Sequence, residues 1–309
     1  QNNETHSKDV KLIVEELDQY YKLGIRQIQL ACDNFIGDLQ WANACVDAII
    51  EWTNRTGARV ALHTWSTINL SGQKELMQKM RRAGFTSLFI GVESFNANSV
   101  LETSKVQNKN SEDQLEKAIC VIQSYGFLIA PGLIFGFDSD TEEMFDYTLN
   151  GVRNSGLVGG DPTFLIALPG TPLYKRMKMT GRLIEHDETD ETLSLERERV
   201  SKVESNIRYL QPKEFLVYGL IHFIKKLTSA NYAYQRVKRH SEIVMEGGNL
   251  IAIHSLGYGN VMQYLKFQLS TPTNVKKFLE RLMILLIPQN FFTILKASAL
   301  VLKHRRKYS

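Results

Sequence analysis

The chain has 309 residues, of which 43% are hydrophobic and 23% charged, an ordinary globular composition that supports a sizeable core in one large or two modest domains. Three irregularly spaced cysteines, Cys32, Cys45 and Cys120, argue against a disulfide framework and against a C-x-x-C metal site, and a reducing cytoplasm is the expected setting. The net charge of +4 is uneven, because residues 1–186 carry 18 Lys/Arg against 22 Asp/Glu and residues 187–309 carry 19 against 11. Basic surfaces suit phosphates, nucleic acid or anionic lipid, although they are more commonly solvated helix faces.

The first half of the chain repeats one unit five times: an amphipathic helix, a glycine that ends it, and a β-rich apolar run. Five such units predict a parallel sheet with helices outside. The predicted helices are 10–23, 41–56, 72–83, 112–125 and 142–155, and the strands that follow them are 25–32, 58–64, 85–92, 127–135 and 163–168.

Right-handed crossovers allow either an open doubly wound sheet or a barrel. The monotonous order of the units favours a partial barrel, and so do the polar residues that recur just past each strand, as at the active-site edge of a barrel. Wet loops would also explain scattered Ser and Thr at these positions, but they explain Asp33 and Glu93 less well. The recurring residues are Asp33, Asn34, Thr64, Ser66, Glu93, Ser94, Asp138, Asp140 and Thr171.

The segment Leu88–Ser94 is the centre of this pattern, because its apolar run ends abruptly in the carboxylate of Glu93. Twelve residues later, Lys105 supplies the opposite charge. A carboxylate accepts two hydrogen bonds from a ribose diol and an ammonium holds a carboxylate, so the pair suits a zwitterionic nucleoside. Alternatively, Glu93 caps the next helix and Lys105 lies on a solvated turn.

Two further segments have unusual patterns of glycine and proline. In residues 132–141, Gly132 and Gly136 flank a strand end and let something flat approach the backbone closely. In residues 167–174, Pro169-Gly170 ends a strand and Pro172 starts a helix. By itself this segment indicates no type of reaction.

The character of the chain changes after Arg182. Residues 185–211 are predicted to be a charged linker between a core at 1–184 and a helical C-terminal domain at 212–309. Helices are predicted at 213–227, after Pro212, and at 231–244. The apolar run 278–302 is interrupted by Pro288 and followed by a basic cluster at 303–307; such a segment either lies on an anionic membrane surface or, more commonly, packs against its own domain.

Taken together, these motifs resemble the radical S-adenosylmethionine superfamily, in the branch with an N-terminal cobalamin-binding domain related to hopanoid-modifying methylases. The matching segments follow one another in the family's order from about residue 10 to residue 183. They are 33–37, 64–70, 83–85, 89–94, 105–108, 132–140 and 167–174. The resemblance implies a partial (β/α)6 barrel lacking its first strand, followed by a mainly α-helical extension.

The resemblance also implies roles for individual residues in binding S-adenosylmethionine. Glu93 would hold the ribose hydroxyls, with Thr64 and Ser94 at the same site, and Lys105 would pair with the methionine carboxylate. The remaining roles fall on the flanking loops: Asp33 and Asn34 near the methionine amino group, Gly132 to Gly136 along the adenosyl part, and Asp138 with Asp140 in the loop that follows.

One departure from the family is decisive. The [4Fe–4S] cluster of these enzymes needs a C-x3-C-x2-C loop after the first strand, and no such run occurs in the 309 residues. The missing strand and the missing loop belong at the same place, before Gln1. The expectation is therefore a C-terminal fragment, inactive as it stands, of a longer enzyme that cleaves S-adenosylmethionine and modifies an unreactive C–H bond.

The leading hypothesis is cobalamin-dependent C-methylation of a hydrophobic or lipid substrate, with an electron-donor protein as partner, no nucleic acid, and a cytoplasmic enzyme that contacts the membrane through its C-terminal segment. Two alternatives remain. One is a barrel without a cluster that binds a nucleoside-type ligand or acts as a scaffold. The other is a phosphate-binding barrel enzyme, which ranks last because residues 167–171 offer only Gly170 for a phosphate loop.

Overall fold

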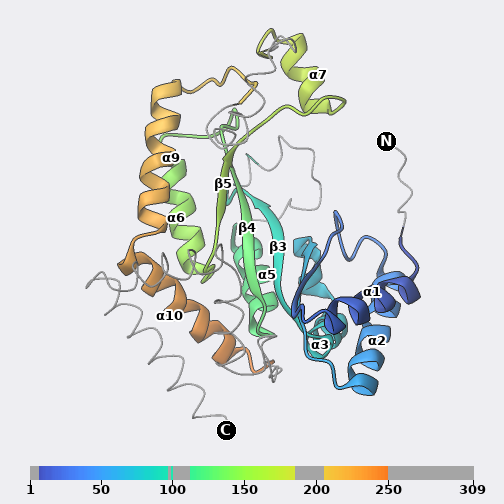
Figure 1. Ribbon diagram of the computed structural model, residues 1–309. Coiled ribbons are helices and arrows are strands. Elements are labelled where there is room, and N and C mark those ends of the chain that lie inside the picture. The colour runs from blue at the N-terminus through green and yellow to red at the C-terminus, as the bar shows by residue number, and fades with distance from the viewer. Residues whose placement is uncertain (1–6, 97–98, 100–111, 185–204, 250–309) are drawn as a thin grey trace.

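The computed structural model describes residues 7–96, 99, 112–184 and 205–249. Helices and strands alternate through the first two of the longer ranges, and two helices follow in the third (Figure 1). The helices are α1 (Val10–Lys22), α2 (Leu39–Thr56), α3 (Lys74–Ala83), α5 (Glu112–Ser124), α6 (Met144–Asn154), α7 (Pro172–Met179), α9 (Lys213–Leu227) and α10 (Ala230–Glu246), with a short 3-10 helix η1 (Ile68–Gly72). The strands are β1 (Gln27–Leu30), β2 (Ala61–Ser66), β3 (Phe85–Glu93), β4 (Leu128–Phe135) and β5 (Asp161–Phe164).

The strands form one parallel sheet in the order β1-β2-β3-β4-β5, so each strand pairs with the next one in the chain. This order, with a helix between successive strands, gives a curled half-barrel and confirms the predicted partial barrel (Figure 1). None of the helices in the described ranges is long and apolar enough to cross a membrane.

The glycines predicted to end the helices adopt the left-handed conformation that this role requires. At Gly84 (φ 103°) the need is also steric, because a Cβ there would lie 2.6 Å from the Val60 carbonyl oxygen. Positive φ is found at all five predicted positions, Gly24, Gly57, Gly84, Gly126 and Gly156.

The two faces of the sheet differ in burial. On β3, the side chains of Leu88, Ile90 and Val92 are fully buried, whereas the intervening Ser87 and Phe89 are only half-buried. Since alternate residues of a strand point to opposite faces, one face packs under the helices. The other face, here called the inner face, is the more open one in the part of the chain that the structure describes.

Helices α9 and α10 share the hydrophobic core of the sheet. The ring of Phe223 on α9 lies 5.0 Å from that of Phe135 on β4, centroid to centroid. Packing against α6 is close at Gly219, where a Cβ would lie 2.0 Å from the Phe145 ring. The domain boundaries drawn at residues 184 and 211 stay predictions, although residues from both sides of them form this one core.

The last strand is shorter and earlier than predicted: β5 covers Asp161–Phe164, not residues 163–168. Residues after Phe164 are held by a segment that is distant in sequence. The Asn206 side chain accepts a hydrogen bond from Ala167 N and donates one to Ala167 O, and the Tyr209 hydroxyl donates to Leu165 O at 2.7 Å. These contacts take the place of strand pairing, so the prediction for this strand was wrong.

Candidate functional site at the strand ends

Glu93 ends β3 in an unusual conformation. Its φ of 66° is the only positive value at a non-glycine residue in the described ranges, and its side chain is 6% exposed. The β3–β4 pairing is irregular at this point, because the register shifts between Gly91 and Glu93. A left-handed φ is costly for a residue with a Cβ and tends to persist at functional sites. The strand therefore delivers a buried carboxylate at its carboxyl end, as the sequence predicted.

Ser66, at the carboxyl end of β2, carries a buried polar atom without a partner. Its side chain is 5% exposed and its Oγ has no hydrogen-bond partner among the described residues. Buried hydroxyls are normally satisfied, so this is an exception among the described residues. Ser66 pairs in register with Ile90, and its side chain therefore lies on the face of the sheet that packs under the helices.

Thr64 has a different environment from the one expected. It is fully buried, and its hydroxyl donates a hydrogen bond of 2.9 Å to the Leu30 carbonyl of β1. Cys32 Sγ lies 3.3 Å from the same Oγ1. The Thr64 hydroxyl thus joins β1 to β2 inside the protein. Its side chain is not exposed in this structure, and its role in binding a cofactor stays a prediction.

Asp33 and Asn34 follow β1 in a loop that is fixed to β2. Phe35 N donates to the Trp65 carbonyl at 2.9 Å, and the Asn34 side chain accepts a hydrogen bond from Ile36 N. Asp33 is exposed and Asn34 is half-buried. The loop therefore lies at the β1–β2 end of the strand edge, with an accessible carboxylate.

The two acidic residues after β4 organise their loop, as the family resemblance implied. Asp140 is buried and accepts hydrogen bonds from Gly136 N at 2.9 Å and Phe137 N at 3.0 Å. Asp138 forms a two-pronged ion pair with Arg182, at 2.9 and 2.6 Å. The hydrogen bonds from Arg182 hold the pKa of Asp138 below its usual value. Both carboxylates already have partners from the protein.

The space beside Gly132 and Gly136 is filled by the chain's own rings. A Cβ at Gly132 would lie 2.8 Å from Phe89 Cζ, and one at Gly136 would lie 2.5 Å from Tyr209 Cε1. The glycines do admit a flat group close to the backbone, and in this structure that group is an aromatic side chain. Contact with an adenosyl group stays a prediction.

Of the two remaining predicted site residues, the structure describes Ser94 but not Lys105. Ser94 is buried next to Glu93, and its Oγ accepts a hydrogen bond from Asn96 N at 3.0 Å. Lys105 lies outside the described residues, so the Glu93–Lys105 pairing stays a prediction.

The three cysteines do not form a site for an iron–sulfur cluster. All are free thiols, and the described residues contain no group of three or more His, Cys, Asp or Glu side chains placed to hold a metal ion. Burial raises the pKa of Cys45 to about 12 and also raises that of Cys120. Because a cluster needs thiolates, these residues do not fit it.

Sequence reasoning missed the residues of the inner face. His63, on β2, has its Nδ1 2.9 Å from the Ser87 Oγ of β3, and burial lowers the pKa of His63. One layer nearer the strand ends, Trp65 and Phe89 place their ring centroids 5.4 Å apart. The sequence did carry a signal for these residues, because His63 and Trp65 alternate along β2 and so share a face of the sheet. The sequence pattern alone does not show, however, which face of the sheet is open.

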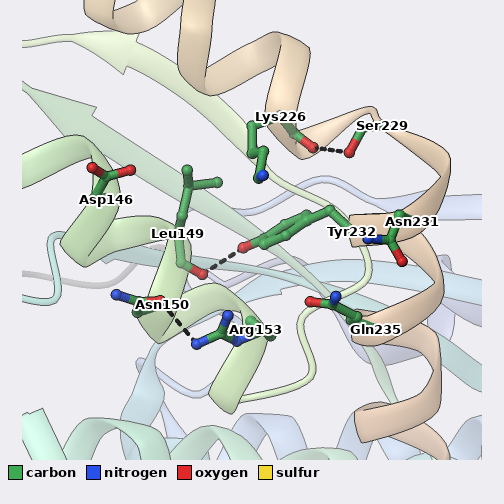
Figure 2. Close-up of a pocket in the computed structure, with 9 residues that line it drawn as sticks. All are labelled: Asp146, Leu149, Asn150, Arg153, Lys226, Ser229, Asn231, Tyr232 and Gln235. Carbon is green, nitrogen blue, oxygen red and sulfur yellow. Dashed lines mark hydrogen bonds between the residues drawn. The ribbon is translucent and has the colours of Figure 1, made fainter.

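A cavity of about 450 Å³ lies away from the strand ends, between α6, the end of α9 and the start of α10 (Figure 2). Its polar groups serve the protein: the Tyr232 hydroxyl donates to the Leu149 carbonyl, and Arg153 donates to the Asn150 side chain at 2.9 Å. Most of its remaining polar side chains are exposed, so the cavity is a groove between packed helices.

Comparison with curated proteins gives two informative relatives. The chain is 30% identical over 211 residues to hopanoid C-2 methylase of Rhodopseudomonas palustris, covering 68% of this chain and 37% of the relative. It is 22% identical over 188 residues to bacteriochlorophyllide d C-12(1)-methyltransferase of Chlorobaculum tepidum, covering 59% and 39%. The chain thus spans less than two-fifths of the length of either relative. No model of a known protein family matches it.

Two solved structures share the fold. The cobalamin-dependent S-adenosylmethionine radical enzyme OxsB superposes with a TM-score of 0.52 at 13% identity, covering 96% of this chain and 46% of OxsB. The radical S-adenosylmethionine methyltransferase TsrM of Kitasatospora setae gives a TM-score of 0.50 at 14% identity, covering 56% of this chain and 32% of TsrM.

Proposed function

We propose a function that follows from the family of this chain. The chain belongs to the radical S-adenosylmethionine superfamily, in the cobalamin-associated branch related to hopanoid methylases. The chain supplies the binding surface for S-adenosylmethionine and substrate in a methyltransferase. The observation that carries this proposal is Glu93, a buried carboxylate held at a positive φ where the central strand ends.

The residues at the strand ends have definite tasks in this proposal. Glu93 accepts hydrogen bonds from the two ribose hydroxyls, for which an ionised carboxylate is suited. Asp140 and the Asp138–Arg182 pair act indirectly, because they fix the loop after β4 against which the ligand lies.

Reductive cleavage of S-adenosylmethionine requires a [4Fe–4S] cluster, which supplies the electron. Since the cysteines of this chain do not fit the cluster, we propose that its thiolate ligands come from a part of the polypeptide outside these 309 residues. The coverage of less than two-fifths of either curated relative supports this proposal. The 309 residues alone are accordingly expected to bind S-adenosylmethionine without cleaving it.

The substrate proposed for the longer protein is hydrophobic, and the transferred group is a methyl group carried by cobalamin. The names of the relatives support methyl transfer, and the aromatic rings on the inner face support an apolar substrate. The proposal also includes an electron-donor protein as partner and a cytoplasmic location with peripheral membrane contact through the C-terminal segment. It includes no role for nucleic acid.

A second candidate function is a binding or scaffold protein that retains the nucleoside site without the chemistry. The misfit of the cysteines to a cluster favours it. Iron and sulfide quantitation on the longer protein, purified without oxygen, separates the two candidates. About four irons per chain support the enzyme, and protein free of iron after reconstitution supports the scaffold.

The first prediction tests Glu93 directly by isothermal calorimetry with S-adenosylmethionine. Glu93→Gln removes the charge that strengthens the ribose hydrogen bonds, so affinity is expected to fall by about tenfold to a hundredfold. Glu75→Gln, an exposed change in the first turn of α3, is the matched control and leaves affinity unchanged. Equal affinities for the Glu93→Gln variant and the wild type would assign Glu93 a purely structural role.

A further inference from the structure

Helix α7 packs with the segment before α9 around a small hydrophobic cluster that is separate from the main core. Residues 165–184 and 205–211 make up this part of the chain, here called the α7 unit. Leu183 pairs with Ile207 in an antiparallel bridge, which joins the two segments. The buried side chains of the cluster are Phe137, which follows β4, and Leu165, Ala167, Met177 and Ile207. The two segments therefore form one folded piece.

The outside of the α7 unit carries large apolar side chains. Met179, at the end of α7, keeps 87% of its surface exposed, Leu210 keeps 64% and Leu168 keeps 61%. The three residues come from the end of α7, the segment before α9 and the segment between β5 and α7. Exposed apolar side chains that gather on one small unit mark a contact surface, whereas single ones scattered over a protein need no explanation.

The formal charge of the α7 unit is entirely positive. Residues 165–184 contain four Lys or Arg and residues 205–211 contain one, and neither segment contains Asp or Glu. Asp138, in the loop after β4, forms its ion pair with Arg182. The exposed cations of the unit are Lys175, Lys178 and Arg208. Positive charge of this density favours an anionic partner.

The α7 unit lies at the same end of the sheet as the candidate site. Strand β5 runs parallel to β4, and β4 to β3, so the carboxyl ends of these strands share one edge. Glu93 ends β3 at this edge, and the chain enters the α7 unit from the same end of β5. Figure 1 shows α7 beyond the ends of the strands, apart from the helices beside the sheet.

We propose that the α7 unit docks on the surface of an anionic membrane, with Leu168, Met179 and Leu210 among the lipid headgroups. A bilayer offers both chemistries that the unit needs, because anionic headgroups meet the cations and the layer beneath them takes up apolar side chains. An acidic protein surface would satisfy the cations alone. This contact is distinct from the one proposed for the C-terminal segment.

Docking in this way brings the edge of the sheet that carries Glu93 close to the bilayer. A hydrophobic substrate then reaches the candidate site without crossing water. This purpose rests on the proposed function, whereas the docking itself rests only on the surface of the α7 unit.

The first test measures binding of the 309-residue chain to vesicles by flotation. The vesicles contain phosphatidylglycerol and phosphatidylcholine in equal parts, or phosphatidylcholine alone, and the chain is expected to prefer the anionic ones. The double variant Lys175→Glu/Lys178→Glu is expected to lower partitioning onto the anionic vesicles by at least about tenfold. Lys225→Glu/Lys226→Glu, the same charge change in the last turn of α9, is the matched control and is expected to lower it by less than about twofold.

The second test places a reporter on the surface itself. Met179→Trp puts an indole at the end of α7, and its fluorescence emission is expected to shift to the blue when anionic vesicles are added, because the ring leaves water. Tyr218→Trp, at a position that is 71% exposed on α9, is the matched reporter and is expected to show no shift. Subtraction of the wild-type spectrum removes the contribution of the native tryptophans. Unshifted emission from Met179→Trp on vesicle-bound chain would overturn the proposal.

Other occupants of the α7 unit give different results with poly-glutamate as a second probe. If an acidic protein is the partner, poly-glutamate binds the wild type but not the double lysine variant, and both bind vesicles equally. If the chain's own acid-rich residues 185–204 occupy the cations, vesicle binding is again equal and poly-glutamate does not bind. Equal vesicle binding by the wild type and the double lysine variant, or no binding by either, therefore refutes membrane docking by this surface.

Calorimetry with S-adenosylmethionine in the absence of vesicles separates this inference from the proposed function. The double lysine variant is expected to bind S-adenosylmethionine as the wild type does. If the wild-type chain docks on vesicles through α7 but does not bind S-adenosylmethionine, the proposed function fails and the docking surface stands. If it binds S-adenosylmethionine but the lysine substitutions leave vesicle binding unchanged, only the docking inference fails.

Discussion

At the scale of single residues, the conformation of Glu93 carries the most information. A residue with a Cβ is disfavoured at φ 66° by roughly 1–2 kcal/mol, and the structure maintains it where glycine would fit without strain. Strain of this kind is retained when the side chain is needed at that place. Stability and function therefore make opposite demands on this position.

The second prediction separates these demands. Glu93→Gly relieves the backbone strain, but it also adds chain entropy to the unfolded state and removes the interactions of a buried carboxylate. These effects offset one another, so the free energy of unfolding is expected to change by less than about 1 kcal/mol. Binding of S-adenosylmethionine is expected to be lost. Urea denaturation followed by circular dichroism measures the first effect and calorimetry the second. Ser94→Gly is the control, because φ at Ser94 is not positive and no strain is relieved; it is expected to destabilise. A loss of more than 1 kcal/mol in the Glu93→Gly variant would contradict the argument.

At the scale of elements, α10 is tied to α5 and α6 through a half-buried imidazole. His240 Nδ1 lies 2.9 Å from Gln123 Oε1, and the Gln123 amide donates to the Ser155 carbonyl after α6. Burial lowers the pKa of His240 to about 4. The neutral imidazole therefore belongs to the folded state, and protonation opposes the docking of α10.

The third prediction is the resulting dependence of stability on pH. The unfolded chain protonates His240 near pH 6.5 but the folded chain only near pH 4, so the unfolded state binds more protons between these values. The free energy of unfolding is expected to fall as pH is lowered from 6.5 to 4, by up to about 3 kcal/mol from this group. His240→Gln reduces the dependence, measured by urea denaturation at several pH values. His222→Gln, exposed on α9, retains it. Identical pH dependence in wild type and His240→Gln would refute the assignment.

At the scale of the whole molecule, the C-terminal helices complete the core that the half-barrel begins. Phe223 packs on Phe135, and the buried Arg236 of α10 donates hydrogen bonds to the carbonyls of Leu157 and Val158 in the loop before β5. Tyr232 donates to the Leu149 carbonyl of α6. These contacts join residues that lie about seventy or more positions apart, so folding of the two parts is coupled.

The fourth prediction follows from this shared core. A chain ending at residue 184 exposes Phe135 and Phe145, and it is expected to lose cooperative unfolding or to aggregate. A chain ending at Asn249 keeps α9 and α10 and is expected to unfold in one cooperative transition. Differential scanning calorimetry measures both. Cooperative unfolding of the 184-residue chain at the midpoint of the longer one would instead establish two independent domains.

The local pattern of the sequence predicted much of the fold but only part of the site. Helix and strand periodicity, with glycine after each helix, predicted five parallel strands in order, because these signals depend on neighbours a few residues apart. Glu93 could be selected because a carboxylate that ends an apolar run is a local signal. Trp65 and Phe89 could not, because apolar residues predict burial until the open face of the sheet is known.

The sequence by itself determined the half-barrel, the carboxylate at the end of its central strand and the absence of a cysteine loop for a cluster. Only the tertiary structure decided how far β5 extends, since its end depends on Asn206, about forty residues away. It also decided that Asp138 belongs to Arg182 and that Phe89 leans over Gly132. The physical reason is the range of each interaction: backbone propensity acts between neighbours in the chain, whereas burial, ion pairing and ring packing act between residues that only folding brings together.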